Sequence, residues 1–158
     1  MAVSVVLNRP PNQLAGAART QYETLATTGV PVDDSVDAFT EKKVGTVVDA
    51  LVGYGLEGPL RGTAADLVGE VDTLDATVVS LEVTSVMVAT TGERPGPSVD
   101  PDRVLTLALP KTGLVEFRSD LYLGDIAIPA GVYHSLNIPY SNPFDDEYWV
   151  ELTRTSDT

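Results

Sequence analysis

Cysteine is absent from this 158-residue chain, and histidine occurs once. The lack of cysteine excludes disulfides, thiolate nucleophiles and cysteine-ligated metals together, but it says nothing about compartment. A Ser-His-Asp system could form only around His134, and no G-x-S-x-G elbow accompanies it. A G-x-x-x-x-G-K-[ST] phosphate loop is also missing. We therefore expect no catalytic residues, no metal ligands and no cofactor.

Basic residues are scarce: 10 lysines and arginines face 23 aspartates and glutamates, a formal net charge of −13. Such self-repulsion destabilises a compact state at low salt. At molar salt the screening length falls to about 3 Å, while the carboxylates still hold water and cations. This balance predicts a halophilic source with surface cations as possible partners; an acidic protein of an ordinary high-GC bacterium is the alternative. A surface this negative makes nucleic acid an unexpected partner.

Long apolar runs are missing as well. No stretch of 18 apolar residues occurs, and Glu82 interrupts the richest run, ATVVSLEVTSVMVAT. The N-terminal MAVSVVLNRPPNQL has a short apolar run without a positive region before it, which is too little for a secretory signal. We expect no membrane span and no classical export.

The length predicts one domain with its own core, preceded by a helical arm. The arm covers residues 1–31 and the main domain residues 32–158. Apolar residues of the arm recur at helical spacing until Gly29 and Pro31 end the pattern. An isolated helix of this length is marginal in water, so its stripe must be buried on something. This stripe is a candidate interface made of Leu14, Ala18, Tyr22 and Leu25.

Residues 35–55 fit both a helix and a strand, and the glycines at 45, 53 and 55 favour a strand. After Leu74 the apolar period is close to two, with the loop GERPGPSVDPD between strands. Six to eight short strands with regular turns predict a mainly β fold: a jelly roll, β-sandwich or small barrel. The apolar residues expected to face inward are Val79, Leu81, Val83, Leu105, Leu107, Leu109, Val115, Phe117, Leu121, Leu123, Tyr148, Val150 and Leu152.

The stretch LYLGDIAIPAGVYHSLNIP, residues 121–139, carries a glycine that opens a strand, a Pro-x-Gly turn and a following histidine. The pattern resembles the second conserved motif of the cupin superfamily, which implies a bent hairpin with a histidine facing into a β-barrel. One residue fewer than in that family separates the first glycine from the proline. The residues that carry the resemblance are Gly124, Asp125, Pro129, Gly131, His134 and Asn137.

The other half of a cupin metal site, two histidines and a glutamate, has no counterpart in this chain. A cation such as Zn²⁺ or Fe²⁺ needs three or four converging nitrogen and oxygen donors. We therefore expect the hairpin to be structural, with His134 as a half-buried strand residue.

The sole tryptophan, Trp149, lies between the inward residues Tyr148 and Val150, so its side chain is expected on the opposite, outer face of the last strand. Outward aromatic residues often mark contact surfaces, which makes Trp149 a further candidate interface residue. An acidic β-domain without catalytic motifs and with an N-terminal arm is similar to the jelly-roll capsid or penton proteins of viruses that infect halophilic archaea. The resemblance implies a non-enzymatic assembly protein that binds itself or other virion proteins. Its location would be the virion, or the cytoplasm of a halophilic host before assembly. The alternative is a small cupin-like enzyme or sugar-binding protein that uses the barrel interior around His134.

Overall fold

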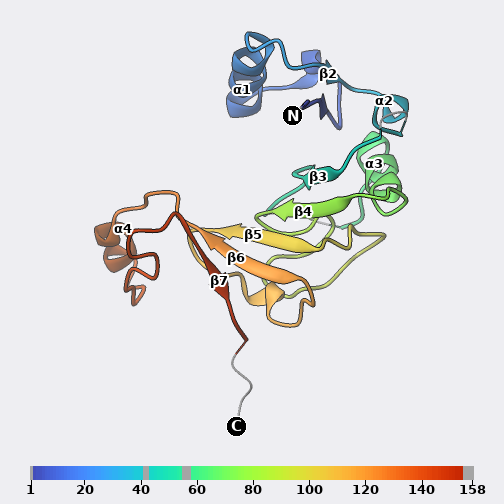
Figure 1. Ribbon diagram of the computed structural model, residues 1–158. Helices are drawn as coiled ribbons and strands as arrows, with labels where there is room; N and C mark the ends of the chain where they lie inside the picture. Colours follow the sequence, from blue (N-terminus) through green and yellow to red (C-terminus); the bar gives the residue numbers. More distant parts are fainter. Residues whose placement is uncertain (1, 41–42, 55–57, 155–158) are drawn as a thin grey trace.

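The computed structural model describes residues 2–40, 43–54 and 58–154. Helices and strands alternate along much of the chain (Figure 1). No helix among the described residues is long and apolar enough to cross a lipid bilayer. The elements are β1 (Val5–Val6), η1 (Pro11–Gln13), α1 (Gly16–Ala26), β2 (Val32–Asp33), α2 (Val36–Thr40), β3 (Thr46–Asp49), α3 (Thr63–Val71), β4 (Thr77–Leu81), β5 (Arg103–Leu107), η2 (Thr112–Leu114), β6 (Asp120–Gly124), α4 (Ala130–Ser135) and β7 (Trp149–Leu152).

The main sheet has five strands in the order β3-β4-β5-β6-β7. The first four strands run parallel, and only β7 is antiparallel, pairing with β6. The short strands β1 and β2 form a separate parallel pair. Parallel neighbours need crossover connections, which α3 and the long loops supply. The protein is therefore of the mixed α/β, Rossmann-like class.

The predicted mainly β jelly roll is wrong, and so is the assignment of residues 32–158 to a β-barrel. Several predicted strands are real, including β4, β5 and β7. Their two-residue period cannot distinguish parallel from antiparallel neighbours, because side chains alternate between faces in both. The helix α3 (TAADLVGEV) is the feature that the strand pattern did not reveal.

Helix α3 covers one face of the sheet at β3 and β4. Its residues Leu67, Val68 and Val71 are buried. Two of them, Val68 and Val71, belong to a core cluster that includes Val47 of β3 and Val78 of β4. A second cluster extends this covered face across β5 and β6, and it contains Val83, Met87, Ala89, Val104, Leu114, Phe117 and Leu121.

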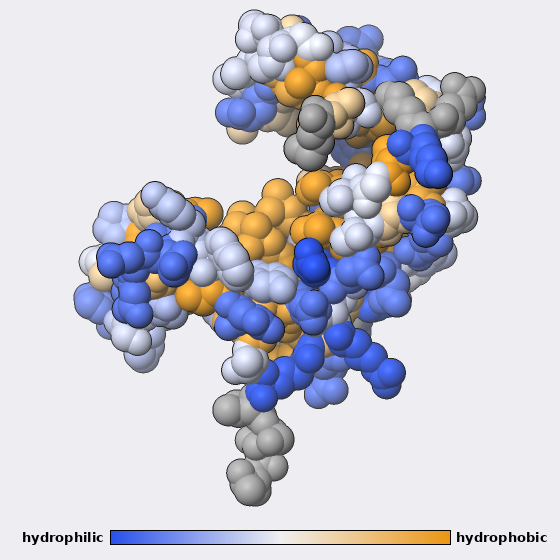
Figure 2. Space-filling model, in the orientation of Figure 1, coloured by the Kyte–Doolittle hydropathy of each residue, from blue (hydrophilic) through white to orange (hydrophobic). Residues whose placement is uncertain are grey.

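The opposite face of the sheet is apolar but incompletely covered. Val48, Leu81 and Trp149 on this face are 64%, 37% and 54% exposed. Figure 2 shows apolar side chains along the hollow that separates the N-terminal elements from the α4 segment. The open face consists of Val48, Val79, Leu81, Leu105, Leu107, Tyr122 and Trp149, placed together by strand register and alternation.

Three segments differ in detail from their predicted secondary structure or burial. The described residues of the range 35–55 contain both structures, the helix α2 and the strand β3, while residues 41, 42 and 55 lie outside the described residues. The strand expected from residue 114 begins only at Asp120, because η2 and a turn precede it, and Val115 is 61% exposed. Among the predicted inward residues of β7, Val150 and Leu152 are half-buried, whereas Tyr148 just before the strand is exposed.

Candidate active site

Glu82 is the first polar residue after β4 and has an unusual backbone. Its φ angle is +74°, in the left-handed region that costs a non-glycine residue about 1–3 kcal/mol. The backbone N–H of Glu82 donates to the Leu105 carbonyl at 2.8 Å, and its carboxylate accepts from the Leu107 N–H at 2.9 Å. These two bonds to β5 fix the carboxylate at the carboxyl ends of β4 and β5.

Lys111 completes a half-buried ion pair with this carboxylate. The side chains of Lys111 and Glu82 are 14% and 21% exposed. The Lys111 ammonium also donates to the carbonyls of Leu107 and Leu109, at 2.7 and 3.0 Å. The lysine is therefore held by three acceptors. An acid-base pair of fixed geometry, screened from much of the solvent, is a typical catalytic arrangement.

A cavity of about 220 Å³ adjoins Lys111. Open α/β sheets bind ligands at the carboxyl ends of their strands, and this cavity lies beside the segment that follows β5. Its size is below the roughly 300–1,000 Å³ that holds a whole drug-sized ligand, so it can hold only part of a larger molecule. Its lining is Tyr54, Ala89, Thr90, Leu109, Pro110, Lys111 and Thr112.

Two loops that line the cavity meet through glycine backbones. The Gly113 N–H donates to the Ala89 carbonyl at 2.9 Å, and the Thr112 hydroxyl donates to the Thr90 carbonyl at 2.7 Å. A Cβ on Gly113 would lie 2.6 Å from the Gly92 nitrogen. Only glycine therefore allows this approach of the loops after β4 and β5.

A buried carboxylate, Asp49, organises the neighbouring loop after β3. It is 2% exposed and accepts from the Ser80 hydroxyl at 2.8 Å and from the Ser85 amide at 2.9 Å. Ser85 in turn accepts from the Val52 N–H at 3.2 Å. This network ties the ends of β3 and β4 together and anchors the segment that carries Tyr54 to the cavity wall. In the described part of the chain, no group of three or more His, Asp or Glu side chains is arranged to hold a metal ion.

The cupin-like motif does not form the expected hairpin. Gly124 ends β6 and Asp125 follows it, with the Asp125 carboxylate accepting from the Ala127 N–H at 2.7 Å. Pro129 is the N-cap of α4, so the chain enters a helix where a second strand was expected. A proline just before a helix favours this start because its φ is preset.

The remaining motif residues lie on or after that helix. Gly131 and His134 belong to α4, and Asn137 follows it with a φ of +55°. His134 is exposed, so the expectations of a half-buried strand histidine and of a barrel interior around it are both wrong. No residue of this motif contacts Glu82 or Lys111 in the described hydrogen bonds and ion pairs.

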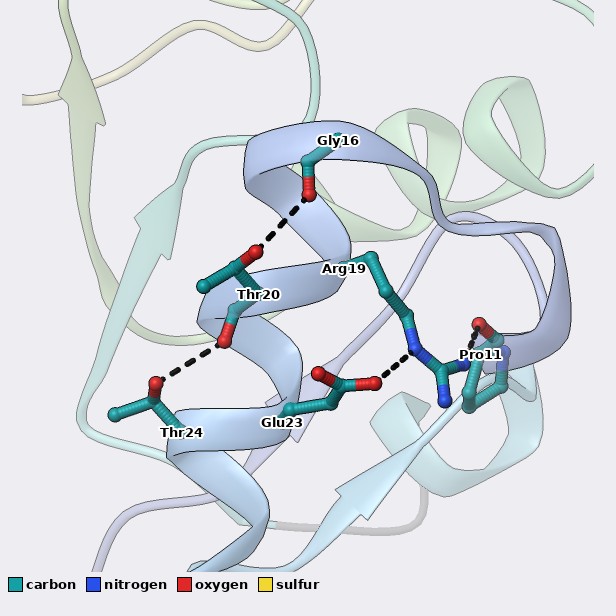
Figure 3. Close-up of polar contacts among 6 residues, drawn as sticks. All are labelled: Pro11, Gly16, Arg19, Thr20, Glu23 and Thr24. Carbon is teal, nitrogen blue, oxygen red and sulfur yellow. Dashed lines mark hydrogen bonds and ion pairs between the residues drawn. The ribbon is translucent and has the colours of Figure 1, made fainter.

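The candidate interface residues of the N-terminal arm lie along α1 and just before it. Leu14, Tyr22 and Leu25 are half-buried, and Ala18 is exposed. The helix has no fully buried residue. Local polar contacts support it instead: Figure 3 shows Arg19 between the Glu23 carboxylate, 2.6 Å away, and a backbone carbonyl.

Trp149, the other candidate interface residue, lies on the open face of β7 and makes an edge contact with Tyr122 at 5.3 Å. Binding of a neighbour by this residue or by the stripe on α1 stays a prediction. The division into an arm and a main domain, and self-association, also stay predictions.

Residues 1–113 match the model of the family described as YjeF-related protein N-terminus. The chain belongs to this family. The crystal structure of the yeast protein YNL200c has the same fold, with a TM-score of 0.75 at 18% identity, over 96% of this chain and 77% of the yeast chain. The cupin and jelly-roll capsid resemblances are therefore wrong.

Curated relatives carry enzyme names. A protein named NAD(P)H-hydrate epimerase from Dehalogenimonas lykanthroporepellens is 40% identical over 109 residues, which are 68% of this chain and 44% of that protein. A protein of the same name from Truepera radiovictrix is 32% identical over 145 residues, 90% of this chain and 65% of that protein. The chain thus spans about half to two thirds of their lengths. The expectations of a non-enzymatic virion protein, of a virion location and of a cupin-like alternative are overturned.

The residues that form the candidate site escaped sequence reasoning because it assumed antiparallel strands. Asp49 ends one apolar strand and Glu82 follows another, which is where an α/β sheet places its ligand-binding residues. Residues 53–58, GYGLEG, also have the G-x-G-x-x-G spacing soon after β3. These positions indicate a ligand-binding site only once the strands are known to be parallel, because only then do their carboxyl ends lie at one edge of the sheet.

Proposed function

We propose that this chain acts as an NAD(P)H-hydrate epimerase, with Glu82 and Lys111 at the reacting centre. The observation that carries the proposal is the half-buried Glu82–Lys111 pair at the carboxyl ends of parallel strands, whose Lys111 lines an open pocket of about 220 Å³. The names of the relatives supply the substrate class.

Epimerisation of the hydrated ring requires one proton to be donated and then taken back, which a single ionisable pair can do. A hydrated nicotinamide ring carries a hydroxyl group on a ring carbon, and inversion of that carbon breaks and remakes a bond there. Loss of the hydroxyl as water consumes one proton, and addition of water from the opposite face returns one, so the proton count balances. The Glu82–Lys111 pair would supply this proton as water leaves and take it back as water adds, with the Lys111 ammonium as the donor and the Glu82 carboxylate as the acceptor.

The backbone of Glu82 supports this assignment. Left-handed conformations of non-glycine residues persist only where the surroundings impose them, and they cluster at active sites. Here the bonds from Glu82 to Leu105 and Leu107 impose the conformation and aim the carboxylate at Lys111. A purely structural ion pair could be placed on a relaxed backbone.

The direct test uses a mixture of the two epimers of hydrated NADH, separated by chromatography as they interconvert. The chain should accelerate interconversion over the buffer blank. Glu82→Gln should lower the rate by about 10²–10⁴-fold, the usual contribution of general acid-base catalysis. Glu116→Gln, at an exposed glutamate, is the matched control and should leave the rate unchanged. No acceleration by a folded wild-type chain would reject the proposal.

A further inference from the structure

The two sheets of this protein have open parallel edges that face the same opening. The order is β2-β1 in one sheet and β3-β4-β5-β6-β7 in the other, so β1 and β3 are both edge strands. In Figure 1 the β1–β2 pair lies beyond β3, separated from it by an opening, and Figure 2 shows the surface hollowed there. Unpaired edges of this kind are binding templates for another strand.

Hydrogen bonding shows which residues border the opening. The Val5 amide donates to the carbonyl of Pro31, just before β2, at 2.9 Å, and the Leu7 amide donates to the carbonyl of Asp33 in β2 at 2.8 Å. The Thr77 amide of β4 donates to the Gly45 carbonyl at 3.0 Å. Because backbone groups alternate sides along a strand, Val6 of β1 and Val48 of β3 direct their N–H and C=O groups away from their present partners. The open edges are thus centred on two valines.

The carboxyl ends of β1 and β3 are held across this opening by one side-chain contact. The Asn8 amide nitrogen, just after β1, lies 3.4 Å from the Leu51 carbonyl, just after β3. Directly paired strands are about 4.8 Å apart and bond through their backbones, whereas strands separated by one other strand are about 9.6 Å apart. A bridge through a whole asparagine side chain fits the second spacing.

Topology indicates the same missing element. With one parallel strand inserted, the order becomes β2-β1-X-β3-β4-β5-β6-β7. Its first six strands have the doubly wound order 3-2-1-4-5-6, in which the inserted strand X is the first, and β6 and β7 extend the sheet beyond them. The structure without X therefore lacks the strand at which the two halves of such a sheet meet.

The open face of the main sheet requires a cover as well. Parallel sheets are found with both faces buried, and here α3 covers one face only. On β4 and β5 the uncovered face bears Val79, Leu81, Leu105 and Leu107, and the covered face bears Val78, Ser80, Val104 and Thr106, so the uncovered face is as apolar as the covered one. The apolar pattern of β4 and β5 is thus that of a face meant for burial.

We propose that a polypeptide segment from outside these 158 residues completes the fold. Its strand, short and rich in β-branched residues, inserts in parallel between β1 and β3, and its flanking amphipathic helix covers the open face. One such segment would fill the gap between the edges of β1 and β3 and also cover the open face of the main sheet. The comparisons are consistent with it, because the yeast structure of the same fold has 23% of its chain outside the match, and the Dehalogenimonas relative has 56%.

The test mixes this chain with the parts of the Dehalogenimonas relative that lie outside the matched 109 residues, each continuous part produced as a separate polypeptide. Light scattering should show a one-to-one complex, and hydrogen exchange should show new protection of the Val6 and Val48 amides. Val48→Asp should weaken binding of the segment roughly 10-fold or more. The bound segment would bury the new carboxylate without a partner, and the aspartate side chain is too short to carry it out to solvent. Val115→Asp, at a valine of similar exposure away from the sheet, is the matched control.

Two results would overturn the proposal. If wild-type chain alone forms a dimer in which the Val6 and Val48 amides are already protected, the occupant is a second copy. If the wild type neither binds the segment nor gains edge protection while remaining folded, the opening is not a strand site. Binding is measured without substrate, so this outcome is separate from the outcome for epimerase activity.

Discussion

Ser85 donates two hydrogen bonds to the carboxylate of Asp49, one from its backbone amide and one from its hydroxyl. Both residues are almost completely buried. Asp49→Asn would put an NH₂ donor against the hydroxyl and amide donors of Ser80 and Ser85. This variant should therefore lower the free energy of unfolding by about 1–3 kcal/mol. Urea denaturation measures this. Asp75→Asn, at an exposed aspartate, should change stability little; equal losses in both variants would contradict the role of the network.

The contact between the Gly92 and Gly113 backbones predicts a strict requirement for glycine. Gly113→Ala places a Cβ 2.8 Å from two carbonyl oxygens as well as against Gly92, and we expect a loss of about 1–3 kcal/mol from overpacking. Gly131→Ala is the control, since a Cβ there meets no atom within 4 Å and alanine favours the helix. Thermal melts of the two variants should move in opposite directions.

The Thr106 hydroxyl is buried and has no hydrogen-bond partner among the described residues. Replacing it with a methyl group removes an unsatisfied polar atom, so Thr106→Val should raise the free energy of unfolding by about 1 kcal/mol. Thr84→Val is the contrasting variant, because the buried Thr84 hydroxyl donates to the Val99 carbonyl at 2.7 Å. It should be destabilising, and a loss of stability in Thr106→Val would reveal a hidden partner.

Tyr133 gives the fold a sensitivity to alkaline pH. Burial, then the neighbouring Tyr140 and Asp125, raise the pKa of Tyr133 above its ordinary value of 10.0. Above pH 10 the unfolded state loses this proton more readily than the folded state, so stability is lost as pH rises through the folded pKa. Melting temperatures at increasing pH should fall less steeply in Tyr133→Phe than in the wild type. Tyr148→Phe, at an 83% exposed tyrosine, should keep the wild-type slope.

The net charge of −13 predicts that salt stabilises the folded chain. Screening lengths fall from about 10 Å at 0.1 M to about 3 Å at 1 M, which removes most repulsion between surface carboxylates. Circular dichroism in dilute buffer and in molar KCl should show a higher melting temperature in salt. A melting temperature that does not change over this range would remove the argument for adaptation to high salt.

Some local features could be read from the sequence alone. Helix α1, the strands β4, β5 and β7, and the loop between β4 and β5 follow from apolar period and from proline and glycine positions, because these act within a few residues. The sequence also excluded thiol chemistry outright, since a missing residue type cannot be supplied by folding.

Strand direction and the assembly of the site were decided only by the tertiary structure. Alternation is the same in parallel and antiparallel strands, so β4 and β5 gave no sign that their carboxyl ends meet. Glu82 and Lys111 lie 29 positions apart in the sequence and become partners only because β4 and β5 run side by side in the same direction. Pro129 could start either a turn or a helix. In the structure it precedes α4, whose buried residue Tyr133 stacks on Tyr140, a contact that the sequence pattern does not reveal. Short-range patterns fix local geometry, whereas a site built from distant strand ends depends on pairings that only the folded chain defines.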